Sequence, residues 1–193
     1  TSTSADGSLN IDPAEPRDQI CPINGQMFTK TEKTVWEQRR PVLTMIENAV
    51  DARPQSGMSS ADVVYEAVAE GGITRFMGIF YCGAAAKSGK VAPVRSTRIY
   101  FVDIAQEYND PIYVHVGGGN CSRDQGTEQC VSDKRAWAIE ELAKIGWRRA
   151  KGNDFDTIFD IGVPVLYRDA NRLGADKTLA VEHTMVGSLG NIW

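Results

Sequence analysis

Two arginines flank a serine in the segment VAPVRSTR (residues 91–98), at the point where a short apolar run leads into an expected helix. The first turn of a helix presents free N–H groups and the positive end of the helix dipole, so it attracts anions. Arg95 and Arg98 weaken the helix there unless an anion neutralises them, and this conflict indicates a functional site. Ser96 has the ordinary role of a helix cap, because no G-x-S-x-G motif surrounds it. The internal carboxylates that could neutralise these arginines instead are Glu66, Glu70 and Asp103.

The segment EGGITRF (residues 70–76) has the pattern of a β-hairpin turn with charged residues at its neck. Gly71 and Gly72 allow a tight turn, and Glu70 and Arg75 leave the two strands beside it. We expect these two side chains to lie on one face and to contact either a common ligand or each other. A cross-strand ion pair on a solvated surface would contribute less than about 1 kcal/mol.

The chain contains two histidines. His115 lies in the apolar run IYVHV, directly before Gly117–Gly119, where the backbone can approach a ligand. A single histidine in a strand is more often a hydrogen-bonded core residue, so both roles stay open. His183 lies in irregular sequence and is a weaker candidate for ligand contact. The glycines match neither G-x-G-x-x-G nor G-x-x-x-x-G-K-[ST], which argues against nucleotide binding.

Basic residues concentrate in one part of this acidic chain of 193 residues. The formal charge is −4, but residues 39–98 carry eight basic and five acidic side chains, and six of the eight are arginine. Planar guanidinium groups suit bidentate contacts with phosphate and carboxylate. The expected ligand-binding set combines four arginines with nearby acidic, hydroxyl and imidazole groups: Arg53, Glu66, Glu70, Arg75, Arg95, Ser96, Arg98, His115 and His183.

The composition excludes several classes of protein. Hydrophobic content of 42% and charged content of 24% are ordinary for a globular protein, and exclude a collagen, a coiled coil and a chain that is disordered throughout. The mild acidity argues against a nucleic-acid binder. No run approaches the roughly 20 apolar residues that span a bilayer. We therefore expect one globular domain of ordinary size.

Four cysteines have no zinc-binding spacing, since no C-x-x-C motif occurs and the histidines lie far apart. Neither a metal nor another cofactor is expected. A disulfide between Cys121 and Cys130 would close a short polar loop and contribute about 2–3 kcal/mol by loop entropy. Cys21 and Cys82 bring the number of cysteines to four, and an even number favours disulfides and an oxidising compartment. The alternative is that all four are buried thiols in a cytosolic protein.

Residues 1–38 have the composition of a flexible spacer and lead-in, with many Ser, Thr, Asp and Pro residues at the start. This start lacks the charged and apolar regions of a signal peptide. It is typical of the spacer that remains after a secretion signal or lipoprotein anchor is removed. The domain itself is expected over residues 39–193.

Hydrophobic periodicity places strands and helices over the rest of the chain. The most distinct pattern is a hairpin at about residues 62–82, with two runs rich in β-branched and aromatic residues around Gly71 and Gly72. Helices are expected at residues 96–108 and 133–147. Strands are expected at residues 42–46, 61–69, 73–82, 91–94, 112–116 and 163–167. A hairpin-like first half and an alternating second half predict an α/β or α+β domain, with a mixed β-sheet flanked by helices.

Several of these segments, in this order, resemble the YerB-like family of bacterial lipoproteins, a domain of unknown function. The matching segments are RRPVLTMIEN (39–48), ARPQSGMSSADVVYEAVAEGGITRFMGIF (52–80), APVRSTRIYFVDIA (92–105) and YVHVGG (113–118), with fainter matches at LYRD (166–169) and EHTM (182–185). The resemblance covers about residues 38–190. The chain departs from the family pattern in two places: APVRST replaces Gly-Pro-Val-Arg-Ser-Ala, and His183-Thr184 replaces His-Asn.

The resemblance implies a membrane-anchored protein of the cell envelope, outside the cytoplasm, and it supports disulfide bonding of the cysteines. The resemblance also implies a smaller C-terminal domain, which we do not expect within these residues. No activity is implied by the family. The arrangement of residues is also similar to that of LytR-CpsA-Psr phosphotransferases, which hold a polyprenyl pyrophosphate with arginines. The residues that would hold the anion in that case are Asp62, Arg75, Arg95 and Arg98.

We expect one of three functions. The first is a binding module in which the arginine set holds an anionic envelope ligand, either a phosphorylated lipid carrier or a peptidoglycan-type glycan. The second is a domain that binds and regulates an envelope enzyme. The third is a phosphotransferase or hydrolase for envelope phosphate or glycosidic linkages, which uses a carboxylate as acid or base, or a pair of carboxylates around a divalent metal. The candidate catalytic carboxylates are Glu70, Asp62 and Asp103.

Overall fold

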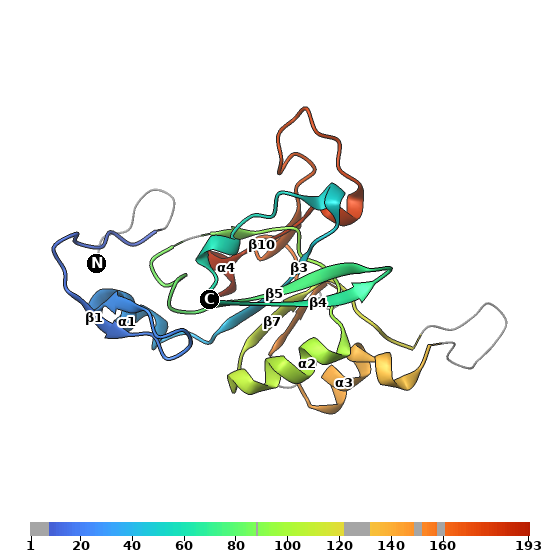
Figure 1. Ribbon diagram of the computed structural model, residues 1–193, viewed down its shortest axis with the longest axis horizontal. Coiled ribbons are helices and arrows are strands. Elements are labelled where there is room, and N and C mark those ends of the chain that lie inside the picture. The colour runs from blue at the N-terminus through green and yellow to red at the C-terminus, as the bar shows by residue number, and fades with distance from the viewer. Residues whose placement is uncertain (1–7, 88, 122–131, 149–151, 158–160) are drawn as a thin grey trace.

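A mixed five-stranded sheet forms the centre of the computed structural model, which describes residues 8–87, 89–121, 132–148, 152–157 and 161–193 (Figure 1). The strand order is β4-β5-β3-β7-β8. Their bounds are β4 (Val63–Glu70), β5 (Ile73–Phe80), β3 (Val42–Glu47), β7 (Ile112–His115) and β8 (Asp154–Asp156). Strand β3 is antiparallel to β5 and parallel to β7, and β7 is parallel to β8. This sheet confirms the expected α/β fold with a mixed sheet.

Strand β3 is buried along its whole length, which explains why its sequence is a continuous apolar run rather than an alternating one. Side chains alternate between the faces of a strand. Val42 and Ile46 therefore enter one hydrophobic core, while Leu43 and Met45 enter another on the opposite face. Both faces of the sheet must be covered to keep these side chains from water.

Helices cover the face that bears Leu43 and Met45. Helix α2 (Ile99–Ala105) and helix α3 (Ala138–Lys144) pack there, below the sheet in Figure 1. Phe101 and Val102 of α2 and Leu142 of α3 are fully buried in this core.

A second, three-stranded sheet and a short helix cover the other face. The sheet has the order β6-β10-β9. The bounds are β6 (Lys90–Val91), β10 (Met185–Ser188), β9 (Leu166–Arg168) and helix α4 (Leu189–Ile192). Val91, Leu166 and Leu189 meet Val42 and Ile46 in this core. Single turns of 3₁₀ helix lie at Val50–Ala52, Met58–Ser60, Gln106–Tyr108, Lys134–Ala136 and Val181–His183.

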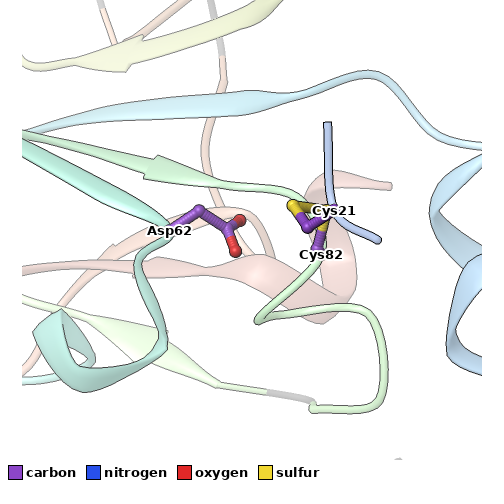
Figure 2. Close-up of side chains that lie close together, drawn as sticks. All are labelled: Cys21, Asp62 and Cys82. Atoms are coloured by element: carbon purple, nitrogen blue, oxygen red, sulfur yellow. A yellow bond between two sulfur atoms is a disulfide. The ribbon is translucent and has the colours of Figure 1, made fainter. Parts of the chain in front are cut away.

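The N-terminal part of the chain is more ordered than a flexible spacer. Strands β1 (Arg17–Ile20) and β2 (Met27–Thr29) pair, and helix α1 (Lys30–Trp36) follows with a capping box between Thr29 and Glu32. A disulfide joins Cys21 to Cys82, directly after β5 (Figure 2). The predicted flexibility is therefore wrong for these elements, because the Cys21–Cys82 disulfide and a buried Trp36 attach them to the domain.

Several expected elements differ in their bounds. The hairpin of β4 and β5 confirms the prediction at residues 62–82. Helix α2 is shorter than residues 96–108, and its N-cap is Arg98 without a side-chain cap bond, so the cap predicted at Ser96 is wrong. Strand β9 starts three residues later than the expected strand at 163–167. Over the described ranges, none of the helices combines the length and the apolar character needed to cross a membrane.

Candidate functional site

The carboxyl ends of three parallel strands meet at one edge of the central sheet. Strands β3, β7 and β8 end there with Glu47, His115 and Asp156. Ligands of α/β proteins usually bind outside this edge, because the loops that follow the strands converge on it. The segment with Arg95 and Arg98 crosses the same edge, since Thr97 forms a parallel bridge with Gly118 after β7.

Glu70 holds the guanidinium groups of two arginines at this edge. Arg75 donates a hydrogen bond of 3.1 Å to Glu70 Oε1, and Arg98 donates to Oε2. The Arg75 side chain is only 2% exposed, and it also donates to the carbonyl oxygen of Ser96 at 2.8 Å. The pairing of Glu70 with Arg75 across the hairpin confirms the alternative in which they contact each other, and Arg98 joins the same carboxylate.

Neighbouring charges and burial shift the pKa of Glu70 in opposite directions. Burial raises the pKa of Glu70, but the hydrogen bonds and positive charges of Arg98 and Arg75 outweigh it and hold that pKa below its ordinary value. Burial and the repulsion from Arg98 lower the pKa of Arg75, against the attraction of Glu70. One carboxylate thus serves two cations, which leaves one positive charge in excess.

A cavity of about 450 Å³ opens beside this group, and we call it the Arg98 cavity. Glu70 and Arg98 line one side, and Arg135 lines another. Arg135 was not among the predicted site residues. Its side chain is 91% exposed and pairs with Asp133 at 2.8 Å.

The glycine loop after β7 forms the floor of the Arg98 cavity. Gly118 and Gly119 line it, together with Asn120 and Ser96. A Cβ atom on Gly119 would lie 2.4 Å from the carbonyl oxygen of Ala136, so only glycine permits this close approach. The Ser96 hydroxyl donates to the carbonyl oxygen of Val116 at 2.8 Å, which fixes the cavity wall to the loop rather than capping a helix.

Arg95 belongs to a different cluster, around Glu47. Arg95 Nε lies 3.2 Å from Glu47 Oε1, and His183 Nδ1 lies 2.7 Å from Oε2. Glu47 is 5% exposed and was missed by the sequence analysis, because it ends an apolar strand without a motif. This cluster ties the turn at Val181–His183 to β3.

Arg53 and Glu66 meet at Asn48 in a third cluster. Arg53 Nε donates to Asn48 Oδ1 at 3.1 Å, and Asn48 Nδ2 donates to Thr74 Oγ1 at 2.7 Å and to Glu66 Oε1 at 3.3 Å. These residues line a cavity of about 500 Å³ between the hairpin turn and the loop after β3.

The expected convergence of four arginines in one hollow is therefore wrong. Arg75 and Arg98 share Glu70, while Arg95 pairs with Glu47 and Arg53 with Asn48. The physical reason is that Arg95 and Arg53 lie outside the strands, in loops that bring them to Glu47 at the end of β3 and to Asn48 directly after it.

His115 is a core residue whose partners the sequence analysis missed. Its side chain is fully buried and lies 2.8 Å from Asp154 Oδ1, with Asp156 Oδ2 at 4.0 Å from the other ring nitrogen. Arg148 contacts both carboxylates, at 3.2 and 3.6 Å. The alternating pair of aspartates in the segment DFD was the available signal, because residues two apart in a strand share a face.

Asp62 lies at the opposite end of the hairpin from Glu70. Strands of eight residues separate the two ends by roughly 26 Å. Its two oxygens accept from the backbone N–H groups of Tyr81 and Gly83, both at 2.8 Å, next to the disulfide (Figure 2). Asp62 therefore fixes the end of β5, and its predicted role in anion or metal binding at the arginines is wrong. Asp103 is exposed on α2.

Within the part of the chain that the structure describes, two groups have residue types that bind metals. In the first, Cys21 and Cys82 form the disulfide and Asp62 accepts backbone hydrogen bonds, so no ligand atom is available. The second is His115 with Asp154 and Asp156, where the Arg148 cation contacts the carboxylates that a metal would need.

The structure describes one disulfide besides the one that was predicted to close the polar loop. Cys21 pairs with Cys82, which are 61 residues apart. Cys121 is disulfide-bonded, and Cys130 lies outside the described residues.

Residues 28–161 match the family described as protein of unknown function (DUF3048), N-terminal domain. The chain belongs to this family. A curated relative, “Putative lipoprotein YerB” of Bacillus subtilis (strain 168), is 51% identical over 88 residues, which are 46% of this chain and 25% of that protein. The crystal structure of the YerB protein from Bacillus subtilis has a TM-score of 0.59 and 31% identity, and the match covers 88% of this chain and 46% of that chain.

Membership of the DUF3048 family confirms the resemblance to YerB-like proteins. The chain spans less than half the length of the YerB proteins that it matches. Family membership gives the fold and a likeness to a lipoprotein of unknown function. The function therefore has to be argued from the site itself.

Proposed function

We propose that this DUF3048 domain binds an anionic group of a cell-envelope ligand in the Arg98 cavity. The observation that carries the proposal is that two guanidinium groups, one of them buried, share the single carboxylate of Glu70 beside the cavity. An incoming phosphate or carboxylate would supply the second negative charge.

The burial of Arg75 and Glu70 differs in a way that suits exchange. Arg75 is buried and anchored to the Ser96 carbonyl, so it cannot leave. The Glu70 side chain is 58% exposed and is free to turn toward solvent. An anion can therefore displace Glu70 from Arg98 while Arg75 keeps a carboxylate oxygen. The exposed Arg135 supplies a second cation at the cavity mouth.

The cavity also has the position and size of a ligand site. It lies outside the carboxyl ends of the parallel strands, and glycines bring the backbone close to its floor. Its volume of about 450 Å³ falls within the usual range for small-molecule pockets.

The class of ligand follows from the compartment. One relative is named “Putative lipoprotein YerB”, and this name, together with the Cys21–Cys82 disulfide, supports a location outside the cytoplasm on a membrane anchor. Anions available there include phosphorylated lipid carriers and the carboxylates of peptidoglycan-type glycans. Both present a group that a guanidinium recognises in bidentate fashion.

The catalytic alternative has less support. Asp62 is committed to backbone hydrogen bonds and Asp103 lies exposed on α2. The low pKa of Glu70 makes it a poor proton acceptor near neutral pH.

An interaction domain is a second candidate, favoured by one observation. Strand β4 is at the edge of the sheet, and its Val64 and Val68 are 41% and 60% exposed. Exposed valines on an edge strand suit the addition of a strand from a partner protein. If the domain binds a partner protein in this way, a crosslinker placed at Val68 should repeatedly capture the same protein in cells.

Calorimetric titration with inorganic pyrophosphate, a soluble peptidoglycan fragment and a polyprenyl pyrophosphate in micelles tests the proposal. We expect at least one probe to bind. Arg98→Ala should weaken its affinity by about tenfold or more, and Glu70→Gln should strengthen it because the competing carboxylate is gone. Arg17→Ala, an exposed change in β1, is the matched control. Binding that is absent, or equal in all variants, would overturn the proposal.

A further inference from the structure

A second cavity lies between the turn of the β4–β5 hairpin and the loop after β3, and we call it the Asn48 cavity. Its volume is about 500 Å³, and it shares no lining residue with the Arg98 cavity. Arg53 and Glu66, which carry opposite charges, both line it, with the Asn48 side chain between them. The proposed function uses none of these three residues.

The Asn48 amide keeps the two charges apart. Its Oδ1 accepts from Arg53 Nε at 3.1 Å, and its Nδ2 donates to Glu66 Oε1 at 3.3 Å. Because the amide group is small, Arg53 Nε and Glu66 Oε1 lie at most about 9 Å apart. Neither Arg53 nor Glu66 forms an ion pair with any residue that the structure describes. The cavity wall therefore presents two separate charges of opposite sign.

Both charged groups have hydrogen-bonding atoms left for a ligand. Arg53 uses Nε and Nη2 for the side-chain and backbone oxygens of Asn48, and its Nη1 has no acceptor among the described residues. Glu66 accepts from Asn48 and Thr74 through Oε1 alone, so its Oε2 has no donor within the same ranges. A ligand with a carboxylate for Arg53 and an ammonium group for Glu66 would supply both missing partners.

Hydrogen bonds fix this polar wall before a ligand binds. Thr74 Oγ1 donates to Glu66 Oε1 at 2.6 Å and accepts from Asn48 Nδ2 at 2.7 Å. Gln55 Nε2 donates to Asn48 Oδ1 at 3.0 Å. Side chains that are already held lose little conformational freedom on binding, which favours affinity.

The loop that bears Arg53 is anchored by residues far along the chain. Arg172 donates to the carbonyl oxygens of Ala52 and Pro54. Lys177 Nζ donates to the carbonyl oxygen of Arg53 at 2.9 Å. These bonds hold the loop against the turn at residues 169–177, so Arg53 is presented from a fixed backbone.

The rest of the lining indicates the class of ligand. Val50 and Ile73 are 74% and 43% exposed, and an apolar group in contact with them would remove apolar surface from water. Asp51 lines the cavity and Lys177 lies beside it, and their opposite charges do not favour a ligand with a net charge.

We propose that the Asn48 cavity binds a free α-amino acid with an aliphatic side chain. Arg53 binds its carboxylate, Glu66 binds its ammonium group, and Val50 and Ile73 contact its side chain. One carbon separates the two charged groups of an α-amino acid, so the ligand spans the gap with a charged hydrogen bond of about 2.8 Å at each end.

Titration of the natural protein with each enantiomer of leucine, followed by the NMR signals of the Asn48 side-chain amide, tests the proposal. We expect at least one enantiomer to bind with a Kd below about 1 mM and to shift these signals. The absence of a saturable shift with either enantiomer at about 10 mM would overturn the proposal.

Analogues of leucine test which groups are recognised. Leucinamide lacks the carboxylate and N-acetylleucine lacks the ammonium group, so each should bind about tenfold more weakly or worse than leucine. Leucylglycine, in which a further residue separates the charged ends, should also bind more weakly. Equal affinity for leucine and the two charge-deficient analogues would refute a site for a zwitterion. Equal affinity for leucylglycine would refute the restriction to a free amino acid.

Two substitutions assign each contact to its residue. Arg53→Gln should bind leucine and leucinamide equally, and Glu66→Gln should bind leucine and N-acetylleucine equally. Glu37→Gln, an exposed change on the N-terminal elements, is the matched control and should discriminate as the natural protein does. Discrimination that persists in Arg53→Gln and Glu66→Gln would contradict the proposal. Both residues are exposed, so both variants should keep the natural melting temperature, and if one does not, the analogues decide.

The result is separable from the test of the proposed function. Arg98→Ala should leave the affinity for leucine unchanged, and Arg53→Gln should leave the affinity for pyrophosphate unchanged, because the two cavities share no lining residue. Loss of leucine binding in Arg98→Ala would place the amino acid in the Arg98 cavity and overturn this inference.

Discussion

Arg75, with only 2% of its side chain exposed, donates a 3.1 Å hydrogen bond to Glu70, whose side chain is 58% exposed. A buried cation is thus neutralised by a carboxylate at the surface. The same carboxylate also accepts from Arg98 beside a cavity. One carboxylate thus pairs with two guanidinium groups, and an external anion can neutralise the remaining positive charge. Both stability and binding therefore depend on Glu70.

Replacing Glu70 by Gln should destabilise the fold. The buried guanidinium of Arg75 loses its counter-ion, and we expect the free energy of unfolding to fall by about 1–3 kcal/mol in urea denaturation. Glu37→Gln, which removes a carboxylate from a surface pair with Lys33, is the control and should change stability by less than about 0.5 kcal/mol. Equal stability of the two variants would show that Arg75 does not need Glu70.

The low pKa of Glu70 predicts an acid-dependent loss of stability. Because that pKa is depressed in the folded state, the stabilisation is complete above the ordinary value of 4.5 and is lost as the pH falls below it. The natural protein should therefore lose stability below about pH 4.5 more steeply than Glu70→Gln. Parallel curves of the melting temperature against pH would contradict the assignment.

Adding one methyl group to the glycine loop should disrupt the cavity floor. In Gly119→Ala the new Cβ would lie 2.4 Å from the Ala136 carbonyl oxygen, so the backbone must shift. We expect a loss of about 1–3 kcal/mol in unfolding free energy, together with weaker anion binding. Gly162→Ala is the control, because nothing lies within 4 Å of its added Cβ. Similar behaviour of the two variants would show that the loop does not need glycine.

Removing the Cys21–Cys82 disulfide should destabilise the domain. The bond closes a loop of 61 residues, so the double change to Ser should cost about 2–4 kcal/mol in unfolding free energy. The N-terminal elements β1, β2 and α1 should then become more sensitive to protease than the central sheet. An unchanged denaturation midpoint would mean that the packing of Trp36 alone attaches them.

Local patterns predicted those parts of the fold that depend on nearby residues. The hairpin followed from β-branched residues around Gly71 and Gly72, and β3 and β7 followed from compact apolar runs. The ordered structure of the N-terminal elements was not predicted, because it depends on the disulfide between Cys21 and Cys82, which are far apart in sequence.

The site was predictable only in part, for the same reason. The pairing of Glu70 with Arg75 is local to one hairpin, and the sequence predicted it as one of two alternatives. The segregation of Arg95 and Arg53 into other clusters depends on their contacts with Glu47 and Asn48, which no motif in the sequence indicated. The partners of His115 come from a strand about 40 residues later, and composition alone could not place it beside β7.

A crystal structure of the protein grown with inorganic pyrophosphate tests the central claim most directly. The account predicts pyrophosphate density in the Arg98 cavity, in contact with the guanidinium groups of Arg98 and Arg135, with Glu70 turned away from Arg98. An empty cavity at millimolar pyrophosphate, with Glu70 still bound to both of its arginines, would contradict it.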